Sequence, residues 1–257
     1  MKPLPIGDEQ LRGKIVAATR PKAIFHTSGL WVIILPENSL LNLEETARML
    51  NPLFHTAKGL KYCVYTSSHI TSEIKRGNIF ISSACLTENL IYDPENISVP
   101  SPEPTKITEI LSQAIAQFHF GAGRSGSLME GAAFYFAKRE LSLTMFMLHQ
   151  ATELLQRGIL LSLTNQNLRS HSIIEFNSKL RKCMPKLVFL EDDSSEEKYL
   201  VERLEYSYSS ARYNIAYEVP EENVWQLFRK LRTYTNTTMQ TFNEKVSCFK
   251  NTYSINH

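Results

Sequence analysis

Apolar residues recur at close to heptad spacing between residues 141 and 159, which predicts a long amphipathic helix with one buried stripe. His149, Glu153 and Gln156 follow one another at intervals of four and three residues, so they share a second face of this helix. We therefore expect a helical bundle in which this helix carries a polar cluster beside its apolar stripe. The apolar positions are Leu141, Met145, Leu148, Leu155 and Ile159.

Two later segments add polar and aromatic groups to the same bundle. An Arg-Ser-His sequence stands at the expected start of the next helix, and an Ala-Arg-Tyr sequence closes a later one. Arginine binds phosphate through its planar fork, and tyrosine can stack on a base. The candidate ligand-binding residues are His149, Glu153, Arg169, His171, Arg212, Tyr213 and Tyr217.

Prolines divide the chain into two parts. Four of them fall within residues 94–104, where they exclude regular helix and favour an extended spacer. We therefore predict a domain over residues 1–93, a linker over 94–104 and a second domain over 105–257. This organisation corresponds to an α+β fold, in which a small mixed α/β domain precedes an up-and-down helical bundle.

The expected elements follow from local patterns. Runs of β-branched and aromatic residues predict strands in the first part, and apolar residues at helical spacing predict helices in the second. The Gly-rich segment 121–127 lacks the lysine of a phosphate loop and is predicted to break or kink a helix. The expected strands are 23–25, 30–35 and 60–65, and the expected helices of the second part are 107–119, 126–137, 140–164, 171–183, 195–217 and 221–245.

The bulk properties narrow the possible function classes. A formal net charge of +2 does not indicate a strongly nucleic-acid-binding surface, and we predict no DNA partner. The four cysteines show neither a disulfide framework nor the spacing of a zinc site, so no metal or other cofactor is expected. No apolar run is long enough for a membrane span, and the chain starts without a secretory signal. We expect a cytoplasmic protein that does not associate with membranes.

The motifs of the second part resemble those of a known family. His149-Gln-Ala-Thr-Glu153 on one helix, a basic residue two positions before His171, and Ala211-Arg-Tyr-Asn-Ile-Ala-Tyr217 on a later helix look like a HEPN domain. The resemblance spans about residues 107–247. It implies a helical bundle that binds a nucleotide or RNA and forms a homodimer.

The first part is similar in outline to the nucleotidyltransferase domain, of the polymerase-β type, that often precedes such bundles. Residues 30–35 take the place of a strand that usually carries paired carboxylates, and residues 76–80 and 88–93 resemble the end of that domain. Nucleotidyl transfer needs two or three carboxylates on a divalent metal, yet residues 1–93 contain neither Asp-x-Asp nor Glu-x-Glu. We expect a degenerate domain without that activity.

The resemblance also bears on catalysis in the bundle. Ribonucleases of the HEPN superfamily carry an arginine followed at this spacing by a histidine, where this chain has Arg212 and Tyr217. A phenol with an ordinary pKa of about 10 is a poor general base at neutral pH. Our prediction is therefore a non-catalytic nucleotide- or RNA-binding protein.

Three alternatives stay open. One is a metal-independent ribonuclease of toxin type, with Arg212 on the phosphate and Tyr217 or His149 carrying the proton. Another is a scaffold that dimerises through its helices. The third is that Arg212, Tyr213 and Tyr217 form only a polar and aromatic packing layer.

Overall fold

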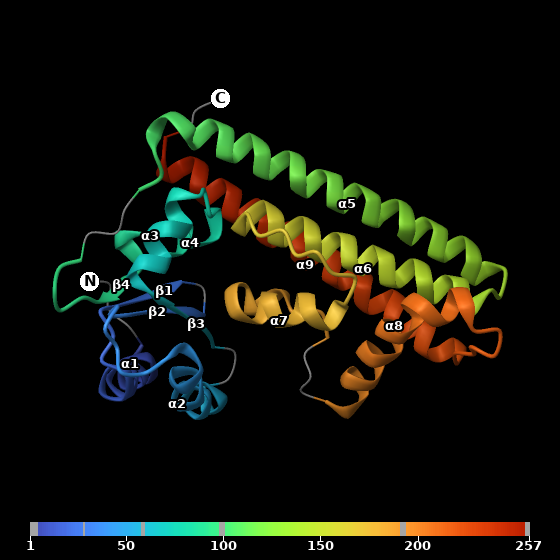
Figure 1. The fold of residues 1–257 in the computed structure, drawn as a ribbon, viewed down its shortest axis with the longest axis horizontal. Helices are drawn as coiled ribbons and strands as arrows, with labels where there is room; N and C mark the ends of the chain where they lie inside the picture. The colour runs from blue at the N-terminus through green and yellow to red at the C-terminus, as the bar shows by residue number, and fades with distance from the viewer. Residues whose placement is uncertain (1–4, 28, 58–59, 98–100, 191–193, 255–257) are drawn as a thin grey trace. The chain divides into compact units, whose positions relative to one another are not determined.

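The computed structural model of this chain divides into two compact units (Figure 1). Unit 1 comprises residues 1–108 with 248–257, and unit 2 comprises residues 109–247. The division falls within the first turn of a helix that begins shortly after the predicted linker. No helix among the described residues is long and apolar enough to cross a membrane. The structure describes residues 5–27, 29–57, 60–97, 101–190 and 194–254.

Unit 1 is built on a four-stranded mixed sheet with the strand order β3-β2-β1-β4. The hairpin of β1 and β2 is antiparallel and pairs Thr27 with Leu30, β3 runs parallel to β2, and β4 runs antiparallel to β1. Gly29 adopts a φ of 76°, the left-handed conformation that glycine takes without steric cost. Residue 28, between the predicted strands 23–25 and 30–35, and residues 98–100 of the predicted linker lie outside the described residues. The strands are β1 (Ala23–Thr27), β2 (Leu30–Leu35), β3 (Lys61–Thr66) and β4 (Leu90–Tyr92).

Helices cover both faces of this sheet, α1 and α2 on one side and α3 and α4 on the other (Figure 1). This arrangement explains why every residue of β2 is buried, as its continuous apolar sequence requires. The four cysteines, all of which lie among the described residues, form no disulfide bond with one another. The helices of unit 1 are α1 (Ile6–Thr19), α2 (Leu43–Thr56), α3 (Ser67–Lys75) and α4 (Ile79–Ala84), with short 3-10 turns η1 (Thr87–Asn89) and η2 (Pro104–Lys106).

Unit 2 is the expected helical bundle, so the α+β fold predicted from the sequence is confirmed. Long helices α5, α6 and α9 run alongside one another, and both α7 and α8 pack on α6 (Figure 1). The buried stripe of α6 includes Met145, Leu148, Leu155 and Ile159, while Leu141 is half-buried. The helices are α5 (Ile107–Ala137), α6 (Leu141–Thr164), α7 (Ile173–Cys183), α8 (Ser195–Tyr213) and α9 (Glu221–Thr252), with the 3-10 turn η3 (Pro185–Leu187) before α8.

The prediction of a helix break at residues 121–127 is wrong, because α5 continues through 31 residues. A Cβ on Gly121 would lie 2.8 Å from the Cα of Gly158, so this glycine permits close backbone approach between α5 and α6. Ser125 strengthens the same contact, since its hydroxyl donates to the carbonyl of Ala151 on α6 at 2.8 Å. Gly121 and Ser125 therefore serve helix packing rather than a turn.

The predicted helix over residues 195–217 ends early, at Tyr213. Asn214 stops it, because its side chain accepts a hydrogen bond from the backbone N–H of Ala216 at 3.0 Å. The helix predicted over residues 171–183 begins later than expected, at Ile173, with Ser172 as its N-cap. His171 and Tyr217 consequently both lie in connections between helices.

Candidate functional site

Glu153 is the centre of a polar cluster in unit 2. It lies on α6 with a side chain that is 4% exposed, and both of its carboxylate oxygens are engaged. Arg157 donates to Oε1 at 2.8 Å, and Nδ1 of His171 lies 3.0 Å from Oε2. The amide of Gln150 also donates to Oε2, at 3.3 Å. A buried carboxylate needs partners of this kind, so the cluster is a stable arrangement in the folded chain.

His149 lies next to this carboxylate and is fully buried. The amide nitrogen of Gln150 lies 3.2 Å from Nδ1 of His149, which assigns the acceptor role to Nδ1 and the proton to Nε2. Nε2 has no hydrogen-bond partner among the described residues. Burial lowers the pKa of His149 to about 4; the attraction of Glu153 opposes this shift, and the nearby His171 and Arg212 add to it. The imidazole is therefore neutral at physiological pH.

His171 occupies the outer edge of the cluster. Its side chain is 60% exposed, and its ring stacks on Tyr208 of α8, with centroids 4.9 Å apart and planes inclined by 15°. Because Nδ1 faces the Glu153 carboxylate, Nδ1 carries a proton and Nε2 is the nitrogen left for other partners. His149 also contacts the Tyr208 ring, at 5.1 Å between centroids.

Arg212 contacts the same tyrosine. Its guanidinium carbon is 4.5 Å from the ring centroid of Tyr208, 5.0 Å from that of Tyr213 and 5.2 Å from that of Phe146. Its Nε donates to the Tyr208 carbonyl at 2.8 Å, and no carboxylate among the residues described here forms an ion pair with it. Arg212 is thus an exposed cation whose position is fixed by aromatic rings and one backbone hydrogen bond.

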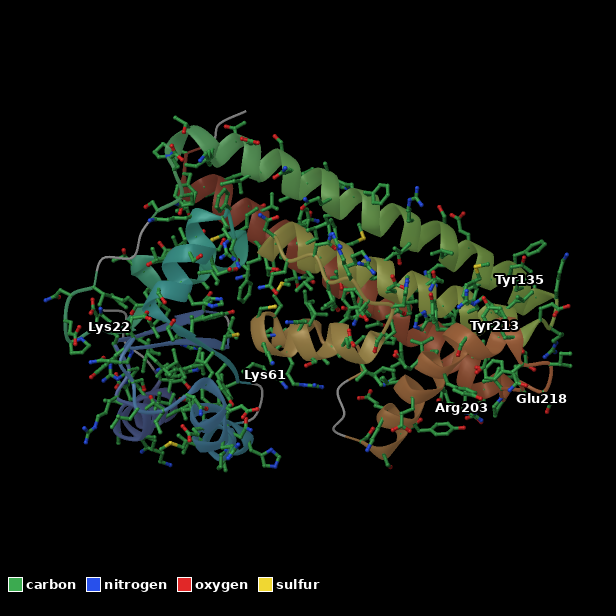
Figure 2. All side chains as sticks on the ribbon, viewed as in Figure 1. Lys22, Lys61, Tyr135, Arg203, Tyr213 and Glu218 are labelled. Carbon is green, nitrogen blue, oxygen red and sulfur yellow. The ribbon has the colours of Figure 1, made fainter. Side chains whose placement is uncertain are left out.

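The structure therefore brings five of the seven candidate residues together. Glu153 contacts His171 directly, whereas His149 and Arg212 join the group through Tyr208. Tyr213 is 78% exposed and touches Arg212 near the connection between α8 and α9 (Figure 2). Arg169 is exposed and forms no ion pair within the described part of the chain.

Tyr217 is placed differently from the other candidates. It is 6% exposed, its ring packs against Tyr206 at 5.9 Å, and Ser142 donates to its carbonyl at 3.0 Å. Its hydroxyl is buried without a partner among the described residues, and burial raises its pKa to about 12. Tyr217 therefore packs in the core of unit 2, where its hydroxyl is not exposed to a ligand at the surface.

Two residues that organise the cluster, Tyr208 and Arg157, are not among the candidates predicted from the sequence. Each stands four residues from a candidate, Tyr208 before Arg212 and Arg157 after Glu153. A spacing of four places both members of each pair on one helix face, so this signal was present in the sequence. We name Glu153, His171, Tyr208, Arg212 and Tyr213 the α6–α8 cluster.

No group of three or more histidine, cysteine, aspartate or glutamate side chains in the described ranges is arranged to hold a metal ion. In unit 1, the carboxylate of Glu37 accepts hydrogen bonds from the backbone and side chain of Ser68, and its pKa is lowered by them. Glu73 is buried and accepts from Asn78 at 2.9 Å. Both carboxylates thus have local structural partners.

Comparison with known protein families gives one match, to the HEPN domain over residues 124–239. The matched segment contains α6, α7 and α8 together with the C-terminal part of α5 and the N-terminal part of α9, and it includes the whole α6–α8 cluster. The HEPN resemblance of the bundle is therefore supported. No curated protein shows significant similarity to the chain.

Proposed function

We propose that unit 2 binds a nucleotide or single-stranded RNA at the α6–α8 cluster and does not cleave it. The observation that carries this proposal is the state of Arg212, an exposed guanidinium held against three aromatic rings without a carboxylate partner among the described residues. A HEPN domain is consistent with a role that involves nucleotides or RNA.

Phosphate is the ligand group that suits Arg212. Its Nε is occupied by the Tyr208 carbonyl, so the terminal Nη nitrogens remain for paired hydrogen bonds to phosphate oxygens. The rings around the guanidinium limit its rotation, which reduces the entropy lost when a phosphate binds. Arg169 adds a second positive charge on the connection that carries His171.

A base is the group that suits Tyr213. This ring is 78% exposed, beside Arg212, and stacking of a base on an aromatic ring is worth about 1–3 kcal/mol. Stacking of this kind requires an unpaired base, which favours a free nucleotide or a single strand over a duplex.

The positions of the two suggested proton carriers favour binding over cleavage. A general base must reach the proton that it removes. The His149 ring is fully buried with a pKa of about 4, and the Tyr217 hydroxyl is buried with a pKa of about 12. Because both groups are buried and neither has a pKa near 7, neither can take a proton from an RNA at the protein surface at neutral pH.

Thermal unfolding with and without ligands tests the proposal. The probes are AMP, GMP and short poly(A) and poly(U) RNAs, each with and without Mg²⁺. A ligand at about 100 times its Kd stabilises the folded state by about 2.7 kcal/mol, which raises Tm by a few degrees. We expect Arg212→Ala to abolish this rise and Tyr213→Ala to weaken it for RNA.

Arg232→Ala is the matched control, because it also removes an exposed arginine from unit 2, but from α9, which carries none of the cluster residues. Stabilisation should persist in this variant. If none of the probes stabilises the wild-type protein, the proposal is wrong and the scaffold alternative takes its place. RNA cleavage that disappears in Arg212→Ala would support the ribonuclease alternative.

We also propose that the protein is a homodimer formed through the bundle and acts in the cytoplasm. The fully exposed Ile215 presents apolar surface at the connection between α8 and α9, which suits a symmetric contact. Light scattering of the purified protein should give twice the 29.4 kDa chain mass. A monomer that persists at high protein concentration would contradict this part of the proposal.

For unit 1 we propose a degenerate nucleotidyltransferase-like domain. Its support is the mixed sheet, in which the β1–β2 hairpin adjoins parallel β3, together with the missing paired carboxylates. Incubation with labelled ATP, Mg²⁺ and RNA should give no transfer of nucleotide. Detectable transfer would contradict it.

A further inference from the structure

Arg157 forms hydrogen bonds with three residues next to the α6–α8 cluster, yet it is not among the proposed ligand contacts. It lies on α6 one turn after Glu153 and is 25% exposed. Its Nη2 lies 2.8 Å from Oε1 of Glu153 and donates to the carbonyl of Ser170 at 2.6 Å, while Nη1 donates to the carbonyl of Leu168. Its guanidinium also lies over the ring of Phe176, 5.2 Å from the centroid.

These contacts fasten the connection between α6 and α7. Residues 165–172 form no helix or strand, so their path depends on side-chain contacts. Arg157 binds the carbonyls on either side of Arg169, and the second of them belongs to the residue before His171. The Arg157 guanidinium thus fixes the backbone of the segment that carries Arg169 and His171.

The same guanidinium orients Glu153. One carboxylate oxygen is held by Arg157, which leaves the other to face Nδ1 of His171. A carboxylate in this position selects the tautomer with the proton on Nδ1 and leaves Nε2 toward the exposed side. Arg157 therefore acts on His171 through Glu153: it orients the carboxylate, and the carboxylate in turn orients the imidazole.

We infer that Arg157 is a positioning residue of the ligand site: it holds Glu153 and residues 168–170 so that His171 presents Nε2 to the ligand. This inference rests on the proposed function, which supplies the ligand. Lysine cannot replace Arg157, because a single ammonium lacks the planar fork that serves a carboxylate and two carbonyls together.

The experiment compares full-length Arg157→Lys with the wild-type protein by two readouts. The first is the nitrogen NMR spectrum of the histidine rings, assigned with His171→Gln, which needs no ligand and reports which nitrogen carries the proton. The second is the affinity for a short fluorescein-labelled poly(A) RNA. We expect the wild-type His171 to be protonated on Nδ1, and Arg157→Lys to show a mixture of tautomers.

We expect RNA affinity to fall about tenfold in Arg157→Lys, as when a residue that orients a liganding histidine is lost. The matched control is Arg48→Lys. Arg48 also pairs with a glutamate one helical turn before it, but its side chain is 76% exposed and it lies in unit 1. This control should change neither readout.

The outcomes separate the two proposals. Unchanged His171 signals and unchanged affinity in Arg157→Lys would overturn the inference and leave the proposed function intact. If the wild-type protein binds no probe, the proposed function fails, and the His171 spectrum still decides whether Arg157 positions the ring. If Arg157→Lys does not fold, the test is the wild-type spectrum alone. A His171 ring with its proton on Nε2 instead of Nδ1 would overturn the inference.

Discussion

Nδ1 of His171 lies 3.0 Å from Oε2 of Glu153, although 18 residues separate them in the sequence and only Glu153 is in a helix. The carboxylate is 4% exposed, whereas the imidazole is 60% exposed. The pair therefore links the buried part of unit 2 to its surface. A ligand that binds His171 would be coupled through this contact to the packing of α6.

Replacing Glu153 with alanine should strongly destabilise unit 2. Three side chains contact this buried carboxylate, and its removal leaves the Arg157 guanidinium without its counter-ion. Breaking a buried ion pair on one side typically costs about 3–5 kcal/mol. Urea unfolding of Glu153→Ala should show a loss of that order, whereas Glu44→Ala, which removes a carboxylate that is 88% exposed, should change stability by less than about 0.5 kcal/mol. Equal stabilities would mean that the cluster is not formed in solution.

His149 should make the protein less stable in mild acid. Its folded pKa is about 4, below the ordinary 6.5, because burial disfavours the charged ring. Between these values the unfolded chain binds a proton that the folded chain does not, so stability falls as pH decreases from about 6.5 toward 4. The full effect is about 3 kcal/mol. The measurement is the free energy of unfolding from pH 7 to pH 5, where few carboxylates titrate.

The control for this pH dependence is His149→Gln, which keeps hydrogen-bonding groups but does not titrate. The decrease in stability between pH 7 and pH 5 should be smaller in this variant than in the wild-type protein. His55→Gln is a second control, because it removes an exposed histidine from unit 1. If the pH dependence of stability persisted in His149→Gln and disappeared in His55→Gln, His55 rather than His149 would be its source, and the prediction would be wrong.

Much of this fold could be predicted because the sequence patterns are local. The period of the apolar residues places the buried stripe of α6, and β-branched runs place β1 and β2 within a few residues. The errors concern residues whose role depends on a distant partner. Gly121 is compatible with a turn or with close packing, and only Gly158 on the neighbouring helix decides between them.

The site was predictable to a similar extent. Helical spacing placed His149 and Glu153 on one face of α6, but it did not indicate that His149 is buried while His171 is exposed. The position of Tyr217 depended on where α8 ends, and that end is set by the side chain of Asn214. Tyr208 meets His171 only after α8 has packed on α6, which no local pattern encodes.

The hydroxyl of Tyr217 should be dispensable for stability, unlike its ring. The hydroxyl is buried without a partner among the described residues, so Tyr217→Phe removes an unsatisfied polar group and should leave stability unchanged or slightly higher. Tyr217→Ala removes the buried ring and should cost about 3–5 kcal/mol. Chemical unfolding of both variants checks this. If Tyr217→Phe abolished RNA-induced stabilisation at full protein stability, the hydroxyl would have to reach the ligand, contrary to its buried position.

Two glycines of α5, only two residues apart, should respond in opposite ways to substitution by alanine. A Cβ on Gly121 would lie 2.8 Å from both the Cα of Gly158 and the carbonyl oxygen of Leu154, which are backbone atoms of α6 and cannot rotate away. Gly121→Ala should therefore force the helices apart and cost about 1–3 kcal/mol. A Cβ on Gly123 meets no atom within 4 Å, so Gly123→Ala should stabilise the helix by about 0.5–1 kcal/mol. Thermal unfolding of the two variants measures the difference, and a loss of stability in Gly123→Ala comparable to that in Gly121→Ala would show that α5 is interrupted here after all.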